Sequence, residues 1–475
     1  MSIRSSFDGT CTVIFDGQRA AAFDPWAMRL YRIDLSEIGS DTHYSEIPTE
    51  LTSKISRLRI TGDDGPMLSW ADGQRDRPAI GRLTINISNN CNLWCSYCYA
   101  DHGFYGSPKS LMSADIARSL AHRAVDCFSS IDVVHFFGGE PLQNPLAVEV
   151  ITQTMAEAFH SGRLTKLPGF VVTTNGTLLN ERILELLKTF AIEPTISIDG
   201  PAEVHDYERP LYSGKGSHAL ILKNVRTLRD EGVNAQFECT YSACHVRKGW
   251  SVVNLLDYFY EELDQQAMHI APASGAEGTP GVARLSELLD PYEEAAAYSV
   301  WNLGRGQGPA LGFVLGILEQ LSAGTPSVSY CPAFFDQVSL SVNGDVFPCF
   351  MFIGDDRFRM GNLLVDEFPN EHSRRVIKEY REAFRYNPSG TEEWYAPLHF
   401  GCTAGDMRLS GKLSERAYEP LQRRIIERTL LELAHLDAKD QVDLTSRAMT
   451  LREKIRHEGC TVRAGNNTEL ITNPN

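Results

Sequence analysis

Six short apolar runs follow one another along the chain, and segments with helical periodicity separate them. The runs cover residues 81–88, 132–137, 170–174, 194–198, 234–241 and 268–271. Between them, residues 114–128 and 181–190 place apolar side chains on one face of a helix. This alternation predicts an α/β fold with a parallel sheet and helical crossovers, as an open doubly wound sheet or a partial barrel. In either case, functional residues are expected at the carboxyl ends of the strands.

The pattern changes after residue 275. A stretch rich in glycine, alanine and proline, 271–281, is typical of a linker or lid. Helical periodicity returns at 285–303, at 310–323 and twice within 412–456, whereas the last residues, 459–475, are polar.

Two β-hairpins are expected outside the alternating region. Near the N-terminus, residues 12–15 and 20–23 are strand-like and flank Asp16-Gly17. Later, Asn343-Gly344 is a favoured two-residue turn between two further strand-like runs. A hairpin closed there would return Cys349 toward Cys331.

Composition and charge narrow the range of functions. The 475 residues are 43% hydrophobic and 22% charged, as in globular proteins, and the net charge of −16 argues against a nucleic-acid partner. Residues 1–10 lack an apolar signal core, and the longest apolar stretch, 310–321, is too short to span a membrane. Eleven cysteines without such a signal indicate a reducing compartment, so we expect a cytoplasmic protein without a membrane partner.

Cys91, Cys95 and Cys98 form the pattern C-x3-C-x2-C directly after the first predicted strand. Three thiolates at this spacing can hold a cubane iron–sulfur cluster and leave its fourth iron without a protein ligand. A zinc site, a disulfide or a chance spacing are the alternatives. Zinc would require a fourth ligand, usually from a second paired motif, and none follows nearby.

Glycine and polar residues follow the next three predicted strands. Gly138-Gly139-Glu140 follows the second strand, Asn175 the third, and Ser197 and Asp199 the fourth. Each group could be a simple turn, because glycine, asparagine and aspartate favour turns wherever they occur. Their shared position at strand ends predicts one common site.

With the aromatic Tyr97 just before its third cysteine, the motif resembles that of the radical S-adenosylmethionine (SAM) enzymes. The resemblance implies that SAM binds the open iron and is cleaved to a 5′-deoxyadenosyl radical, which takes hydrogen from a substrate. It also implies SAM contacts by Gly138, Gly139, Glu140, Ser197, Asp199 and Tyr97, with Asn175 and Arg209 as further candidates. Glu140 would pair with the SAM ammonium group. No residue is singled out as a catalytic base.

The pattern C-x12-G-x4-C from Cys331 to Cys349 resembles the opening of the SPASM/twitch domains, which hold auxiliary clusters in radical SAM enzymes. Full SPASM domains contain several more cysteines, but only Cys402 follows at a suitable place. We therefore expect one auxiliary iron–sulfur cluster held by Cys331, Cys349 and Cys402, with an unidentified fourth ligand. An alternative is that Cys331 and Cys349 are buried core thiols.

Further motifs resemble the peptide-modifying members of this superfamily, in particular the thioether-forming maturases such as the quinohemoprotein amine dehydrogenase maturase. They include Phe136-Phe-Gly-Gly-Glu-Pro141, Ser197-Ile-Asp-Gly-Pro201 and Gly344-Asp-Val-Phe-Pro-Cys349. The fold implied is a partial (β/α)6 TIM-like barrel with a small N-terminal α+β domain and a C-terminal twitch/SPASM-like domain. The expected divisions are a leader-peptide-recognition-like domain at 1–80, the barrel at 81–275, a linker with helices at 276–326, the auxiliary domain at 327–410, and C-terminal helices with a polar tail at 411–475.

The resulting hypothesis is a radical SAM enzyme that cross-links a ribosomally made precursor peptide. Its partners would be that peptide and a flavodoxin or ferredoxin-type electron donor. Since the auxiliary cysteines are fewer than in the thioether enzymes, the type of bond formed is left open. A radical SAM dehydrogenase or epimerase of a small metabolite, and a non-catalytic metal-stabilised peptide-binding protein, are the alternatives.

Overall fold

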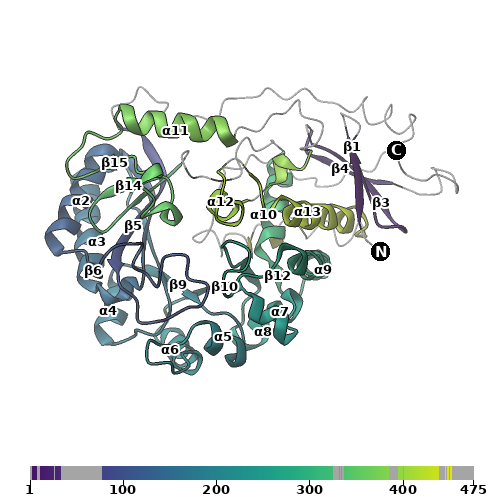
Figure 1. The fold of residues 1–475 in the computed structure, drawn as a ribbon, viewed down its shortest axis with the longest axis horizontal. Coiled ribbons are helices and arrows are strands. Elements are labelled where there is room, and N and C mark those ends of the chain that lie inside the picture. Colours follow the sequence, from purple (N-terminus) through teal and green to yellow (C-terminus); the bar gives the residue numbers. More distant parts are fainter. Residues whose placement is uncertain are drawn as a thin grey trace.

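The computed structural model describes residues 3–7, 11–25, 27–33, 77–324, 331, 333, 336–384, 394–399, 401–413, 415–437, 444, 447–448 and 450–451. Helices surround one large curved sheet, and a small N-terminal sheet lies beside α13 (Figure 1). Residues 34–76 of the expected N-terminal domain, and the polar tail at 459–475, lie outside the described residues.

The six predicted strands are all present and run parallel to one another. They are β5 (Ala79–Asn89), β7 (Ser130–Gly138), β8 (Gly169–Thr174), β9 (Ile192–Ser197), β10 (Gln236–Tyr241) and β11 (Ala267–Pro272). They lie in chain order across the sheet, as a series of right-handed crossovers requires. The α/β prediction is therefore confirmed, and the strands of the described chain do not close into a complete barrel.

Several short strands of the described residues were not predicted, and one of them stands where a helix was expected to begin. Residues 310 and 311 were expected to begin a helix, but they form β12 (Ala310–Leu311), which pairs with Ala267 and Met268 of β11. Helix α10 (Gly312–Ala323) begins only after this pairing. The apolar run alone could not distinguish a buried edge strand from the first turn of a helix.

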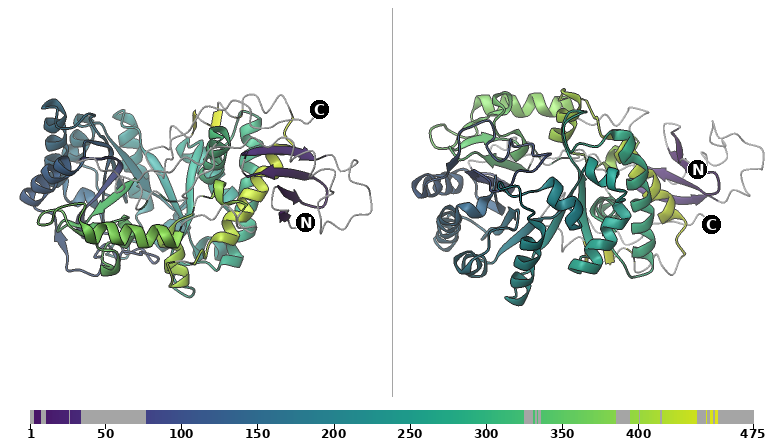
Figure 2. Two further views of the ribbon diagram at one scale, coloured as in Figure 1. Left: turned by 90° about the horizontal axis from the view of Figure 1, so that it is seen from above. Right: turned by 60° about the horizontal axis from the view of Figure 1, so that its bottom comes forward.

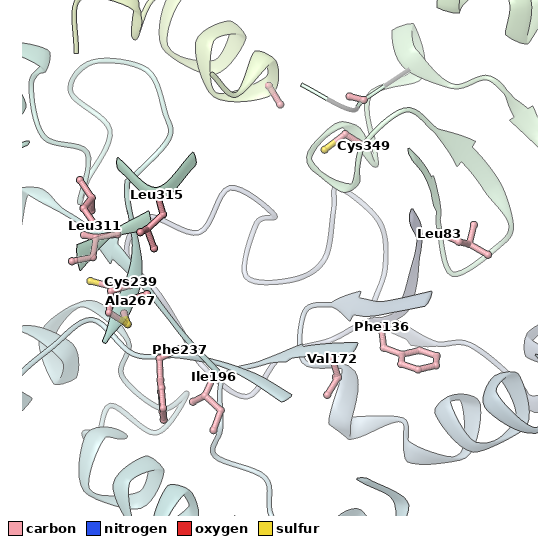
Figure 3. Close-up of a cluster of buried hydrophobic side chains, with 14 of the residues drawn as sticks. Leu83, Phe136, Val172, Ile196, Phe237, Cys239, Ala267, Leu311, Leu315 and Cys349 are labelled. Carbon is pink, nitrogen blue, oxygen red and sulfur yellow. The ribbon is translucent and has the colours of Figure 1, made fainter. Parts of the chain in front are cut away.

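The two faces of β10 differ in exposure. On β10, Phe237, Cys239 and Tyr241 are buried, whereas Glu238 and Thr240 between them are half-buried. The buried set lies on the face covered by helices, where Leu83, Phe136, Val172 and Ile196 also point (Figure 3). Because successive side chains alternate between faces, Glu238 and Thr240 point to the opposite, concave side of the sheet.

Helices connect the parallel strands and lie along the outside of the sheet (Figure 2). Those in the described residues are α2 (Ala114–Cys127), α3 (Pro145–His160), α4 (Glu181–Thr189), α5 (Ala202–Glu208), α6 (His218–Asp230), α7 (Ala243–Lys248) and α8 (Val252–Leu263). Side-chain caps begin both helices that were predicted from the sequence: Ser113 accepts from the backbone of Ile116 at α2, and Asn180 from that of Ile183 at α4. The predicted helices at 114–128 and 181–190 are confirmed.

The predicted second hairpin is present and extends the main sheet. Strand β13 (Gln337–Leu340) pairs in parallel with β5 and antiparallel with β14 (Asp345–Phe347), which pairs with β15 (Gly361–Asn362). The turn is not the expected two-residue one. Ser341 accepts from the backbone of Gly344 at 3.0 Å, and Gly344 adopts φ +86°, so the connection spans four residues and uses glycine in its last, left-handed position.

The N-terminal part forms a separate antiparallel sheet. Its strands are β1 (Arg4–Phe7), β2 (Thr12–Phe15), β3 (Ala20–Asp24) and β4 (Arg29–Ile33), and the predicted hairpin joins β2 and β3. The sheet packs on α13 (Glu419–Ala434), where Arg19 makes two 2.7 Å hydrogen bonds to Glu432.

The remaining described elements lie between these two sheets or at their edges. They are β6 (Ser110–Leu111), α9 (Leu285–Gly304), α11 (Glu371–Phe384), α12 (Thr403–Ser410) and the 3-10 turns Pro141–Gln143, Phe350–Phe352, Asp356–Phe358 and Ala396–Leu398. Of the helices described, none combines the length and the apolar character needed to cross a bilayer.

Candidate functional site

The three cysteines of the C-x3-C-x2-C motif lie on the loop between β5 and β6, which we call the cysteine loop (residues 90–109). A second segment, residues 208–212, holds this loop in place through backbone hydrogen bonds. Trp94 donates to the carbonyl of Pro210 at 2.8 Å, and Ser96 donates to that of Glu208 at 2.9 Å. The loop therefore has a defined conformation although it contains little regular secondary structure.

Cys91, Cys95 and Cys98 are free thiols, each only partly exposed. Burial raises the pKa of Cys91 to about 11 and raises that of Cys95 further. The other two thiols contribute to the rise at Cys95, whereas the guanidinium of Arg209 opposes it. The three sulfurs are thus within electrostatic reach of one another, although in the described residues no three His, Cys, Asp or Glu side chains converge as a ready metal site.

Gly138 and Gly139 bring the end of β7 against the cysteine loop. A Cβ atom on Gly139 would lie 2.4 Å from the carbonyl oxygen of Asn90, and one on Gly138 would lie 2.4 Å from Oδ1 of Asn86. Gly138 also adopts φ +146°. Only glycine permits this approach of two backbone segments without displacing one of them.

Glu140 is completely buried beside these glycines. Its carboxylate accepts hydrogen bonds from the backbone of Leu142 (2.9 Å), the hydroxyl of Thr174 (2.8 Å) and the backbone of Asn175 (2.7 Å). Burial nevertheless raises its pKa to about 7. The side chain thus joins the ends of β7 and β8, and its pairing with a SAM ammonium group stays a prediction.

Asn175 connects the end of β8 to the cysteine loop. Its Nδ2 donates to Oδ1 of Asn92 at 2.9 Å and contacts Sγ of Cys91 at 3.7 Å. The backbone of Leu93 also donates to this sulfur at 3.4 Å. Hydrogen bonds to sulfur stabilise its thiolate form, which is the form that binds metal.

Tyr97, Asp199 and Arg209 form a buried network at the ends of β9 and β10. Nε of Arg209 donates to Oδ2 of Asp199 at 2.9 Å, and the hydroxyl of Tyr97 donates to the same oxygen. The backbone of Thr240 donates to Oδ1 at 3.0 Å. Because Arg209 lies beside it, the pKa of Asp199 is lowered although burial acts in the opposite direction. The guanidinium also lies 5.3 Å from the centre of the Tyr97 ring.

Ser197 lies at the carboxyl end of β9 and donates from Oγ to Oε1 of Glu238 at 2.7 Å. Sequence reasoning did not identify Glu238. A glutamate inside an apolar strand gives a weak signal, and it becomes informative only when the sheet shows which face it occupies.

Two other residues of the site were also missed. Glu208 is fully buried and accepts hydrogen bonds from the hydroxyls of Ser96 and Ser242, the latter at 2.7 Å. Arg408 of α12 donates to the carbonyls of Met351 (2.7 Å) and Tyr99 (3.4 Å). Its contact with Tyr99 links segments more than 300 residues apart in the chain, so no local pattern could have predicted it.

The auxiliary candidates occupy three different environments. Cys331 is half-buried, Cys349 is buried and Cys402 is exposed at the start of α12. Sγ of Cys402 lies 3.7 Å from the sulfur of Met351. Burial raises the pKa of Tyr99, and the thiols of Cys349 and Cys98 raise it further. Tyr99 therefore lies near one auxiliary candidate and one cysteine of the C-x3-C-x2-C motif. A shared cluster held by Cys331, Cys349 and Cys402 stays a prediction.

A surface cavity of about 300 Å³ lies elsewhere, at the amino-terminal ends of β10 and β11. Its lining includes Arg229, Gln236 and Gln265. Because these positions are at the opposite strand ends from the cysteine loop, the cavity is separate from the candidate site.

Comparison with known proteins identifies the superfamily of the central part of the chain. Residues 85–250 match the model of the radical SAM superfamily, so this part of the chain is a radical SAM domain. Such a domain implies SAM and a [4Fe–4S] cluster as cofactors. The matched region contains the cysteine loop and the ends of β7, β8, β9 and β10 described above.

The similarity to three known proteins extends beyond this domain. The antilisterial bacteriocin subtilosin biosynthesis protein AlbA of Bacillus subtilis is 24% identical over 345 residues, covering 70% of this chain and 66% of AlbA. The cysteine-type anaerobic sulfatase-maturating enzyme of Clostridium perfringens strain 13 is 24% identical and covers 68% of this chain and 89% of that enzyme. The solved structure of anSMEcpe with AdoMet and Cp18Cys peptide has a TM-score of 0.62 at 18% identity, over 79% of this chain and 99% of anSMEcpe, and shows the shared fold.

Several other curated relatives are matched over a smaller part of their length. The chain spans about half the length of these relatives, 49% in one case and 43% in another.

Proposed function

We propose that this protein is a radical SAM enzyme that modifies a ribosomally made precursor peptide, forming a cross-link within it. The observation that carries the proposal is the cysteine loop, which places three free thiols against the carboxyl ends of the parallel strands inside a radical SAM domain. The similarity to AlbA supports a peptide substrate, because AlbA is named for the biosynthesis of a bacteriocin and matches 70% of this chain.

Cys91, Cys95 and Cys98 would hold the [4Fe–4S] cluster. The residues present fit such a group, because the thiols are unpaired with one another, gathered on one loop, and next to the buried guanidinium of Arg209. When bound, the cluster and SAM supply a 5′-deoxyadenosyl radical that can take a hydrogen atom from the substrate. The protein supplies the loop that holds the thiols in position.

The surrounding residues would position SAM at the strand ends. Gly138 and Gly139 allow close backbone approach, and Glu140 fixes the segment they belong to. Ser197 and Asp199 present polar atoms at the end of β9, and Arg209 compensates the buried negative charge of Asp199. We propose these roles together with those of Tyr97 and Asn175, whose contacts connect the cysteine loop to the sheet.

The C-terminal region would add one auxiliary iron–sulfur cluster on Cys331, Cys349 and Cys402. Its location is supported by the position of Tyr99 near Cys98 on one side and Cys349 on the other. The N-terminal sheet would bind the leader segment of the precursor by adding a strand to one of its edges. A flavodoxin or ferredoxin-type protein would supply the electron.

Co-expression with a short peptide encoded beside this protein, followed by mass spectrometry of the peptide, tests the proposal. A cross-link lowers the peptide mass by the mass of two hydrogen atoms, and Cys95→Ala abolishes the change. An unmodified peptide together with active SAM cleavage would instead favour a dehydrogenase or epimerase of a small metabolite. Zinc without iron in the anaerobically purified protein would favour a non-catalytic peptide-binding protein.

A second candidate is the maturation of a sulfatase-like protein. It is favoured by the match to the sulfatase-maturating enzyme of C. perfringens, 89% of which is covered. Incubation with a synthetic peptide carrying a sulfatase modification site separates the two functions. Conversion of that peptide, with no change in the neighbouring precursor, would support the second candidate.

A further inference from the structure

We propose that Glu238 is a substrate-binding residue on the concave side of the sheet, where its carboxylate accepts a hydrogen bond from an amide, hydroxyl or ammonium group of the segment being modified. The inference rests on the proposed function and deepens it, because it identifies where the reacting part of the substrate is held.

The exposure of the strands locates this site. On β10 the residues on the helix-covered face are buried, whereas Glu238 and Thr240 on the other face are half-buried. The same alternation occurs on β11, where Met268 and Ile270 are buried and His269 is half-buried. On the concave side of β10 and β11, Glu238, Thr240 and His269 therefore keep some exposure, whereas Gln236 and Ser197 on the same face are buried.

Glu238 lies two residues before Thr240 on β10, and so on the amino-terminal side of the strand ends. Thr240, two residues later on the same face, donates its backbone N–H to Asp199 in the network that contains Tyr97 and Arg209. Two residues of a strand span roughly 7 Å, so Glu238 is about that far toward the amino ends. A molecule bound at the strand ends would have Glu238 directly beneath it on the concave side.

The neighbours of Glu238 leave part of its carboxylate uncommitted in the described structure. Oε1 accepts the hydrogen bond from Ser197, and among the described residues no group donates to Oε2. Ser197 and His269 are its neighbours in the sheet register, on β9 and β11. Burial raises the pKa of Glu238, with Asp199 acting in the same direction and Arg209 and the Ser197 hydroxyl opposing it.

A structural role through Ser197 is the main alternative. Glu238 could serve only to orient the Ser197 hydroxyl toward SAM. Glu238→Gln distinguishes the two roles, because a glutamine oxygen can still accept the bond from Ser197 while the negative charge is lost. Ser197→Ala removes the bond itself, and Glu238→Asp retains the charge on a shorter side chain.

The experiment uses a precursor peptide that the wild-type enzyme modifies, so that a failure of the proposed function is seen beforehand in the wild type. SAM affinity, 5′-deoxyadenosine release without peptide, and kcat and KM for the peptide are measured for each variant. Affinity for the core segment of the peptide, without its leader, is measured by fluorescence anisotropy on the reconstituted protein with SAM and without reductant, so that no turnover occurs. Loss of a charge-assisted hydrogen bond predicts a roughly 30- to 100-fold fall in kcat/KM for Glu238→Gln.

Two further results are expected from a substrate-binding Glu238. In Glu238→Gln, core-peptide affinity falls by a larger factor than SAM affinity or peptide-independent 5′-deoxyadenosine release, and Glu238→Asp recovers part of the activity. Full peptide modification by Glu238→Gln would overturn the inference. So would a loss of SAM affinity equal to that of Ser197→Ala with unchanged core-peptide binding, because Glu238 would then act only through Ser197.

Discussion

Arg209 and Asp199 form an ion pair with 2.9 Å between Nε and Oδ2, and both side chains are less than a tenth exposed. Tyr97 of the cysteine loop donates its hydroxyl to the same carboxylate oxygen. The pair therefore connects the loop that carries the three thiols to the ends of β9 and β10. Because both charges are buried, each depends on the other for compensation.

Asp199→Asn is expected to lower the free energy of unfolding by about 3–5 kcal/mol, because it leaves the guanidinium of Arg209 buried without its counter-ion. Urea unfolding measures this loss. The matched control is Asp355→Asn. Oδ2 of Asp355 lies 2.6 Å from Nη2 of Arg357, whose side chain is 66% exposed. Because solvent screens such a pair, the control is expected to lower the free energy of unfolding by less than about 1 kcal/mol. Equal effects of the two substitutions would show that the buried pair contributes no more than a surface one.

Gly139→Ala is expected to displace the cysteine loop, because the added methyl group would lie 2.4 Å from the Asn90 carbonyl oxygen. Overpacking of this kind costs about 1–3 kcal/mol, and we expect a clear fall in iron bound per protein after reconstitution. The control is Gly316→Ala in α10, where no neighbouring atom lies within 4 Å. Helix propensity predicts that this control gains up to about 1 kcal/mol. Normal iron content in Gly139→Ala would contradict the close approach.

Glu140 predicts a pH dependence of stability. Its folded-state pKa of about 7 lies above the ordinary value of 4.5, so between these values the folded protein keeps a proton that the unfolded chain has lost. The stabilisation is present below about pH 4.5 and is lost as the pH rises toward about 7, by about 3 kcal/mol in total. Urea unfolding of wild type and Glu140→Gln across this range measures the difference. Identical slopes in the two proteins would contradict the raised pKa.

Arg408 predicts a coupling between the auxiliary region and the cysteine loop. Its guanidinium bonds the carbonyls of Met351 and Tyr99, and a lysine cannot span both. Arg408→Lys is expected to cost about 1–2 kcal/mol and to speed hydrogen exchange in residues 95–105. Arg359→Lys, in a half-exposed pair with Asp345, serves as the control and leaves exchange in this loop unchanged. Unaltered exchange in Arg408→Lys would argue that the two regions are held together by other contacts.

The elements of the barrel could be predicted from the sequence because each depends on a local pattern. The apolar runs identified all six strands, and Asp16-Gly17 and Asn343-Gly344 identified the hairpins β2–β3 and β13–β14. Local patterns failed where pairing decides the outcome. Strand β12 exists because Ala310 and Leu311 meet the edge of β11, and the second turn is wider because Ser341 closes it.

The candidate site could be predicted in its motifs but not in its connections. The cysteines and the strand-end residues were recognisable as types at fixed spacings. The acceptor of the Tyr97 hydroxyl, the enclosure of Glu140 and the position of Glu238 depend on side chains from separate strands and loops. Such contacts arise only when the sheet brings those segments together, so a single sequence contains no direct signal for them.

The central claim is that the cysteine loop supports radical cleavage of SAM, and release of 5′-deoxyadenosine tests it most directly. The anaerobically reconstituted and reduced wild-type protein is incubated with SAM, and the nucleoside is quantified by chromatography and mass spectrometry. We expect 5′-deoxyadenosine from the wild type and none from Cys95→Ala. Absence of the nucleoside from the reconstituted wild type, or equal amounts from the variant, would contradict the account.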